Sequence, residues 1–289
     1  MTILSINSGS RARRSGALPT VRVPITIVIP TLNEVDSLST GLPDLKWADE
    51  VIVADGGSTD GTRDMAVSLG ARVLLVEGRT IAGQRNAAIA VARNRWILAL
   101  DADEQVTPEL RDDLRVLVFS NAAGPTVYRV RSRNWHMGGE LRHGPWGRDW
   151  KLRVFTRDHR FGERRVHEQL EDPGAIGTLK GTLVHYPYRD LSHQVSKIAT
   201  YASWASEDLR DRGRFATTWD MMVRPPWRFF RDYVIQSGWR DGTRGFIVAG
   251  VSAFSVFLKY ASLWARVRTP RVAVAARRSE AVAVRTVGS

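Results

Sequence analysis

The chain has 289 residues, a length that suits one large domain or one domain with an appendage. Hydrophobic residues make up 43% and charged residues 25%, which excludes a disordered, collagen-like or polytopic membrane protein. Because there is no cysteine, disulfides, thiolate zinc sites and cysteine nucleophiles are also excluded, and a reducing, cytoplasmic location fits. No apolar segment of signal-peptide length precedes the basic run at 11–14, so we expect no export.

The net charge of +12 is concentrated in the C-terminal part of the chain. Residues 1–120 hold 13 Lys/Arg and 15 Asp/Glu, whereas residues 121–289 hold 29 and 15. Within 224–289 the cations alternate with tryptophan, phenylalanine and tyrosine. This mixture favours an anionic membrane surface as a partner, with nucleic acid as the competing interpretation.

Alternating strands and helices are predicted after a flexible basic leader at 1–22. Apolar, often β-branched runs predict buried strands; they lie at 25–29, 50–54, 71–76 and 96–100. Two stretches with helix start and stop signals separate the later strands; they lie at 60–69 and 81–93. The alternation predicts a parallel sheet with helices on both faces.

The pattern changes after residue 124. Strands are predicted at 126–133 and 151–156, joined by a Gly/Trp/His-rich loop at 135–150 that is a candidate acceptor-binding flap. An amphipathic helix is predicted at 191–211. Two apolar segments follow a Pro-Pro pair, at 227–235 and 246–258. The second is shorter than the roughly 20 residues of a membrane span, so we expect helices that lie in the membrane interface.

Polar residues follow three of the predicted strands, at 30–34, 55–60 and 101–105. Ligands of open α/β sheets bind at the carboxyl ends of strands, so these segments are the expected site. The first strand is not followed by the glycine pattern of a dinucleotide fold or of a P-loop, which disfavours redox and NTPase functions.

Asp101 and Asp103 lie two residues apart at a strand end, where period-two geometry can direct both carboxylates to one place. Such oxygen ligands select Mg²⁺ or Mn²⁺, and the ion then bridges to substrate phosphates. The alternative is a simple Asp-rich turn before a helix that is capped by Thr107, with Pro108 at its first position.

Four ordered segments resemble glycosyltransferase family 2 with a GT-A fold. They are Pro-Thr-Leu-Asn-Glu at 30–34, Asp-Gly-Gly-Ser-Thr-Asp-Gly-Thr at 55–62, Gly-Gln-Arg-Asn-Ala at 83–87 and Asp-Ala-Asp-Glu at 101–104. Further segments at 152–155, 161–168 and 185–188 resemble the branch with bacterial lipopolysaccharide-core β-glucosyltransferases and related envelope-glycan enzymes.

The resemblance implies an α/β fold with a Rossmann-like, mostly parallel sheet flanked by helices and a C-terminal amphipathic helical appendage. The expected catalytic domain covers 23–220, with a donor-binding half at 23–120 and an acceptor half at 121–220. Amphipathic membrane-interface helices at 221–268 and a basic tail at 269–289 would follow.

The same resemblance implies that Thr31, Glu34 and Asp55 hold the uridine of a UDP-sugar and that Arg85 approaches its diphosphate. Asp103 would ligate the metal, Asp101 would lie beside the ribose or the metal, and His167 would be a further ligand or orient the site. The remaining expected substrate contacts are Pro30, Asn33, Gly57, Arg153 and Arg165.

Inverting sugar transfer needs a base for the acceptor hydroxyl, while the metal stabilises the departing diphosphate. Glu168 is the favoured base and Asp149 the second candidate. The wider family has an acidic pair where this chain has His-Glu at 167–168, and the alternative for Glu168 is a surface ion pair with Arg164 or Arg165. Trp135, Trp146 and Trp150 are candidates for stacking on a sugar, and His185 is expected to be structural.

These patterns together predict a metal-dependent inverting glycosyltransferase that uses a UDP-sugar and a lipid-linked or core-oligosaccharide acceptor. It would be cytoplasmic and peripheral (monotopic) on the inner face of the cell membrane. One alternative is a polyprenyl-phosphate glycosyltransferase, which Gln105 would permit. The other is a non-catalytic, basic nucleic-acid-binding module, but we expect no nucleic-acid partner because the cations lie in an apolar, aromatic segment.

Overall fold

The computed structural model describes residues 22–78, 80–120, 124–147, 149–162 and 169–268. The strands are β1 (Val23–Thr31), β2 (Ala48–Asp55), β3 (Arg72–Leu75), β4 (Trp96–Ala99), β5 (Glu104–Val106), β6 (Val127–His136), β7 (Gly139–Leu141), β8 (Asp149–Thr156) and β9 (Ile176–His185). The α-helices are α1 (Val35–Gly41), α2 (Thr62–Ser68), α3 (Ile81–Ala90), α4 (Pro108–Phe119), α5 (Leu191–Asp211), α6 (Thr218–Phe230) and α7 (Gly242–Arg268). Short helical turns are η1 (Leu42–Leu45), η2 (Gly144–Trp146), η3 (Arg231–Ile235) and η4 (Gly238–Asp241).

A single mixed sheet has the strand order β3-β2-β1-β4-β8-β6-β9-β5, with β7 paired to β6. The first four strands in this order are parallel, as predicted, and β8 is antiparallel to β4. Alternate residues of β1 enter two apolar clusters, with Ile27 in one and Val28 in the other. The sheet is therefore buried on both faces, as parallel sheets usually are, and β8 begins at the edge where β4 ends.

The predicted loop at 135–150 was wrong in its first part, because residues 135–141 form a β-hairpin. Strand β6 continues through His136, which pairs with Gly139 of β7. Met137 and Gly138, the two residues between them, have φ of 49° and 72°, as a two-residue hairpin turn requires. Only a short stretch around η2 then separates β7 from β8.

Two predicted boundaries in the C-terminal helices were also wrong. Helix α6 begins before the proline pair, because Thr217 and Asp220 form a capping box at its start. Helix α7 passes through Lys259, whose Nζ lies 4.7 Å from the ring centroid of Tyr260. The stretch Gly238–Arg268 has 31 residues and contains an 18-residue window with a mean hydropathy of 1.7, so it is long and apolar enough to cross a membrane by length and composition. The shortness argument against a span therefore does not hold.

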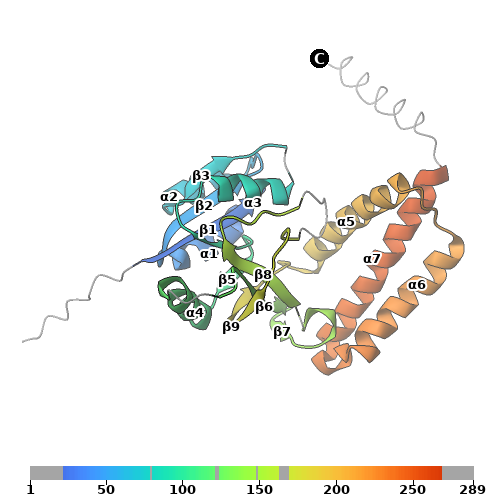
Figure 1. Cartoon of the computed structure of the whole chain (residues 1–289). Helices are drawn as coiled ribbons and strands as arrows, with labels where there is room; N and C mark the ends of the chain where they lie inside the picture. The colour runs from blue at the N-terminus through green and yellow to red at the C-terminus, as the bar shows by residue number, and fades with distance from the viewer. Residues whose placement is uncertain (1–21, 79, 121–123, 148, 163–168, 269–289) are drawn as a thin grey trace, which may run out of the picture.

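Helices α5, α6 and α7 form a group beside the sheet, in which α7 packs against both of the others (Figure 1). Arg266 of α7 pairs with Glu207 of α5 at 2.9 Å and donates to Ser203. The helix predicted at 191–211 is confirmed as α5. Because α5 packs against α7, it belongs to the same helical group as the helices predicted from residue 221 onward.

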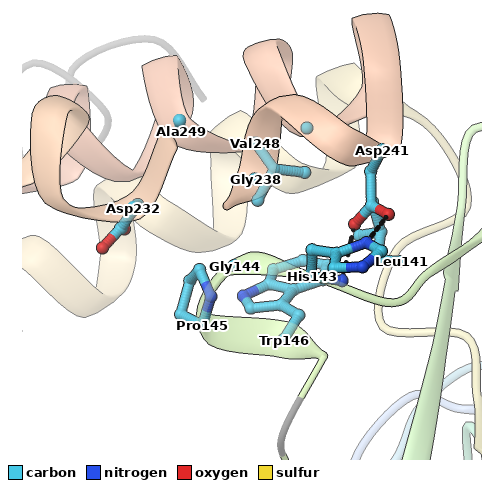
Figure 2. Close-up of a pocket in the computed structure, with 11 residues that line it drawn as sticks. Leu141, His143, Gly144, Pro145, Trp146, Asp232, Gly238, Asp241, Val248 and Ala249 are labelled. Atoms are coloured by element: carbon cyan, nitrogen blue, oxygen red, sulfur yellow. Dashed lines mark hydrogen bonds and ion pairs between the residues drawn. The ribbon is translucent and has the colours of Figure 1, made fainter. Parts of the chain in front are cut away.

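Asp241 fixes this helical group to the connection between β7 and β8 (Figure 2). Its carboxylate accepts hydrogen bonds from the backbone N–H of Arg142 (3.0 Å) and His143 (2.8 Å) and pairs with His143 Nδ1 (2.7 Å). The cavity beside this contact holds only about 10 Å³, the space of one water at most. It lies at the seam between sheet and helices and is not the candidate site.

Candidate functional site

The ends of β1 and β2 bring Thr31 and Asp55 together. The two residues are register partners in the parallel pair, and the Thr31 hydroxyl donates to Asp55 Oδ2 at 3.1 Å. Both side chains are buried. The structure thus places two of the predicted uridine contacts in one position at the carboxyl edge of the sheet.

The Asp55 carboxylate also organises the turn that follows β2. Its Oδ1 accepts from the N–H groups of Gly57 (3.1 Å) and Ser58 (2.8 Å), and its Oδ2 accepts from the Ser58 hydroxyl. Burial raises the pKa of Asp55, but these hydrogen bonds outweigh burial and hold the pKa below its usual value. Gly57 has φ of 104°, a backbone conformation that favours glycine.

Asn33 connects the β1–α1 loop to the β2–α2 loop. It has φ of 57°, which asparagine tolerates better than most residues. Its Oδ1 accepts from Thr59 N at 2.9 Å, and its N–H donates to the Ser58 hydroxyl at 2.8 Å. Asn33 therefore holds together the two loops that follow Thr31 and Asp55.

Glu34 and Pro30 flank this position. Glu34 is half-buried and accepts from the Ser37 hydroxyl at 2.8 Å. Burial raises the pKa of Glu34, and the nearby charge of Asp103 adds to the increase. Pro30 is the half-buried penultimate residue of β1.

Asp101 lies after β4 between two arginines. Arg85 of α3 donates to one carboxylate oxygen of Asp101, and Arg153 of β8 donates to the other. Arg153 also donates to Glu104 at 2.8 Å, and Lys151 donates to the same Glu104 oxygen at 2.9 Å. Burial raises the pKa of Asp101, but Arg153 and Arg85 hold it well below its usual range. The cluster contains three cations and two carboxylates, and a third carboxylate, that of Asp149, lies 3.7 Å from Lys151 Nζ.

Two of the arginines that were predicted to contact phosphate belong to this cluster. Arg85 and Arg153 were expected to contact phosphate, and the structure binds both to Asp101. Glu104 and Lys151 were not predicted as site residues, although alternate positions of one strand share a face and Lys151 precedes Arg153 by two. The arginines therefore hold Asp101, the first residue of the Asp-x-Asp loop, in place.

Asp103 faces His185, a residue that the sequence analysis treated as structural. Asp103 Oδ1 lies 3.4 Å from His185 Nε2, while His185 Nδ1 lies 2.7 Å from Asn134 Oδ1. Asn134 donates its own amide to Trp146 O at 2.9 Å, so its oxygen faces the imidazole. An amide oxygen only accepts, so the proton of a neutral His185 is on Nδ1 and the Nε2 lone pair faces Asp103.

Aromatic side chains lie next to this pair. Trp146 and Tyr188 have ring centroids 5.9 Å apart, and Lys197 Nζ lies 5.8 Å from the Tyr188 centroid. Burial raises the pKa of Tyr188 to about 12. Of the predicted sugar-stacking tryptophans, Trp146 lies at this position. The ring of Trp150 instead contacts the Arg129 guanidinium, whose Cζ lies 4.9 Å from the ring centroid.

The residues predicted at 165, 167 and 168 lie outside the described part of the chain. On either side of that segment, Phe161 is bridged to Leu170 and Gly162 N donates to Gln169 O at 3.0 Å. Asn86 of α3 holds Phe161 through two hydrogen bonds, of 2.8 and 2.9 Å, to its backbone. Asn86 belongs to the Gly-Gln-Arg-Asn-Ala motif at 83–87 but is not among the site residues predicted from the sequence. Asp149, the second base candidate, lies 3.7 Å from Lys151 Nζ.

The family model described as Glycosyl transferase family 2 matches residues 26–181, more than half of the chain. The chain belongs to glycosyltransferase family 2. It is therefore a glycosyltransferase, and its mixed sheet with flanking helices is the GT-A fold that the motifs predicted.

This family 2 glycosyltransferase is similar to several individual proteins. The lipopolysaccharide core biosynthesis glycosyltransferase LpsC of Rhizobium meliloti (strain 1021) is 28% identical over 85% of this chain and 93% of its own length. An uncharacterized glycosyltransferase of Rickettsia felis is 27% identical over 83% of this chain and 89% of its own. The crystal structure of mannosyl-3-phosphoglycerate synthase from Rubrobacter xylanophilus is 16% identical, covers 68% of this chain and 77% of its own, and has a TM-score of 0.43.

Proposed function

We propose that this glycosyltransferase transfers a sugar from a UDP-sugar to a hydroxyl group of a lipid-linked or core-oligosaccharide acceptor, with inversion and with the help of Mg²⁺ or Mn²⁺. The observation that carries the proposal is the pair Asp103 and His185, which converge beside the Asp101–Arg85–Arg153 ion-pair cluster at the carboxyl edge of the sheet. The similarity to LpsC supports an envelope-glycan acceptor.

The residues around Asp103 fit a divalent cation. A carboxylate oxygen and an imidazole lone pair at 3.4 Å repel unless a proton or cation lies between them. A carboxylate suits Mg²⁺ or Mn²⁺, and an imidazole favours the transition metal of the two, Mn²⁺. Both Asp101 oxygens are bound by arginines, so Asp103 is the primary ligand in this proposal and Asp101 lies beside the ribose or the metal. When bound, the ion supplies Lewis-acid stabilisation of the leaving diphosphate.

The donor nucleotide would bind where β1 and β2 end. Uracil can donate its N–H to Asp55, in place of the Thr31 or Ser58 hydroxyl that donates there now. Pro30, Asn33, Glu34 and Gly57 shape this position, and Arg85 and Arg153 add positive charge on the diphosphate side. Arg165 and His167 stay proposals from the sequence.

A base must take the proton of the acceptor hydroxyl as its oxygen attacks the anomeric carbon on the face opposite the diphosphate, which inverts the configuration. Glu168 is the proposed base and Asp149 the second candidate. Glu168→Gln should abolish transfer and keep UDP binding, because only proton removal is lost. If Asp149→Asn has this effect and Glu168→Gln does not, the roles are reversed.

The first test is calorimetric titration of UDP with Mn²⁺ or Mg²⁺ present and then with chelator. We compare the wild type with Asp103→Ala, His185→Gln and Asn134→Leu, and with Asp112→Ala as an exposed carboxylate control. Metal-dependent binding should persist in Asp112→Ala and be lost in Asp103→Ala. Asn134→Leu should weaken metal affinity about 10- to 100-fold, because the imidazole loses its orienting partner.

Two results would contradict the proposal. Equal UDP affinity with metal and with chelator would remove the metal from the donor site. No UDP binding in any condition would remove the UDP-sugar and direct attention to other nucleotide or lipid-phosphate donors.

We also place the reaction at the cytoplasmic face of the membrane, where a lipid-linked acceptor would be available. The cationic, aromatic C-terminal helices support this location.

A further inference from the structure

Helix α6 exposes apolar side chains along one face. The exposed residues recur at three- and four-residue spacing, which places them on one side of a helix; they are Trp219, Met222, Val223, Trp227, Phe230 and Val234 of the following turn η3. Trp219 and Trp227 are 70% and 57% exposed. We refer to these six residues as the α6 stripe.

The α6 stripe is turned away from the rest of the helical group. Pro225 is buried, and Phe229 packs on Phe246 of α7 with ring centroids 5.5 Å apart, so these residues mark the inner face of α6. Helix α6 lies on the outer side of α7 (Figure 1). Surface helices of soluble proteins usually show a polar outer face, and a contiguous exposed apolar patch indicates an interaction site.

The charge that accompanies the α6 stripe is positive. Residues 212–268 contain ten Lys/Arg and three Asp/Glu. Asp220 is bound within the α6 cap and to Arg224 at 2.7 Å, and Asp241 holds the β7–β8 connection. Asp232 is buried against Arg228 and Arg231. Because the protein's own groups neutralise these acids, the outward charge is cationic.

We infer that the α6 stripe, extended by the exposed Trp239 of η4, docks on an anionic lipid bilayer with α6 and α7 lying along its surface. Exposed tryptophans suit the headgroup region, and arginines such as Arg214 and Arg240, both exposed, complement anionic lipids. This inference rests on the membrane location in the proposed function and names the surface that achieves it.

Two other arrangements fit the described residues less well. A second copy docked through the same stripe would bring identical cationic surfaces face to face, since a two-fold interface pairs a patch with itself. A membrane-spanning α7 would place charged groups in the bilayer. Helix α7 carries Lys259 about two-thirds of the way along its length, pairs with Glu207 of α5 and lies against Arg224 of α6.

Docking through α6 also connects the bilayer to the candidate site. Helix α7 packs against both α6 and α5, and α5 begins six residues after His185. The described contacts therefore form one continuous path from the α6 stripe to the Asp103–His185 pair.

The test is flotation of the full chain with vesicles of phosphatidylcholine that contain about one-third phosphatidylglycerol, compared with phosphatidylcholine alone and over a salt series. The test variant is Trp227→Ser/Phe230→Ser. The matched control is Val116→Ser/Phe119→Ser, which removes two exposed apolar side chains from α4. UDP binding is measured for every variant to show that the sheet is folded.

We expect the wild type and the α4 control to float with anionic vesicles and to be released by salt. The α6 variant should bind these vesicles about tenfold or more weakly, with UDP binding unchanged. The inference is overturned if the α6 variant binds anionic vesicles as strongly as the wild type does. It is also overturned if the wild type binds neutral vesicles alone or does not float with any vesicles. Loss of a wild-type dimer in the α6 variant, without flotation, would assign the stripe to a second copy. Flotation without UDP binding would instead reject the proposed donor and keep the docking surface.

Discussion

Arg153 donates a hydrogen bond to Asp101 from a strand that runs antiparallel to the one Asp101 follows. The same Arg153 nitrogen, Nη2, donates to Glu104 at 2.8 Å, and Glu104 in turn accepts from Asp101 N at 3.0 Å. The Arg153 and Glu104 side chains are buried. One guanidinium thus holds both ends of the Asp101–Glu104 turn against the sheet.

Arg153→Met should destabilise the protein strongly. In this variant, Lys151 is the one remaining ion-pair partner of the buried Glu104 carboxylate, and Arg85 is the one remaining ion-pair partner of Asp101 among the described residues. Removing one partner of a buried ion pair costs about 3–5 kcal/mol of stability. Urea unfolding measures the change in the free energy of unfolding. The control is Arg129→Met on the neighbouring strand β6, where the arginine is exposed and a change within about 0.5 kcal/mol is expected. Equal, small losses in both variants would contradict the role of Arg153.

Asp55 should contribute stability that depends on pH. Its folded-state pKa is lowered relative to the ordinary value of 3.8, so the ionised form is the one that folding favours. The contribution is fully present above the unfolded pKa and is lost as the pH falls through the folded pKa. Asp55→Asn should cost about 1–3 kcal/mol at pH 7, because it leaves buried donors without acceptors.

The measurement is the difference in unfolding free energy between wild type and Asp55→Asn from pH 7 down to pH 3. The difference should be constant to about pH 5 and shrink below about pH 4. A difference that grows on acidification would show that the folded state favours a protonated Asp55.

The elements that the sequence predicted well are those with a strong local signal. The β-branched run of β1, the full length of α5 and the Thr107 cap, with Leu110 N donating to its hydroxyl at 3.3 Å, follow from nearby residues. The polar ends of parallel strands also met as predicted. These inferences required no knowledge of which distant segments touch.

Contacts between distant segments could not be predicted in this way. Strand β9 was missed because its glycines weaken the strand pattern. Gly181 is needed there, since a Cβ would lie 2.2 Å from Leu110 Cα of α4. The orientation of His185 depends on Asn134, 51 residues away, and only the assembled sheet brings the two together.

Asn86 should position the segment that carries the proposed base. Its amide donates to Phe161 O at 2.8 Å and accepts from Phe161 N at 2.9 Å, and the neighbouring Arg85 lies 4.9 Å from the Phe161 ring centroid. Asn86→Asp keeps the acceptor but replaces the donor by a second acceptor that repels the Phe161 carbonyl. We expect a fall in kcat of about 10- to 100-fold, since a base misplaced by about 1 Å loses this much. UDP affinity should stay within about twofold, because Asn86 does not touch the Asp55 or Asp103 positions.

The assay compares kcat and UDP affinity for wild type, Asn86→Asp and Asn94→Asp. Asn94 is a matched control, because its side-chain amide donates hydrogen bonds to Thr26 and Asp49. These contacts lie away from the carboxyl edge of the sheet. A parallel loss of UDP binding and kcat in Asn86→Asp would indicate general damage to α3, and an unchanged kcat would show that Phe161 needs no anchor. A selective loss of kcat that Asn94→Asp does not reproduce would link α3 to the acceptor half of the site through Phe161.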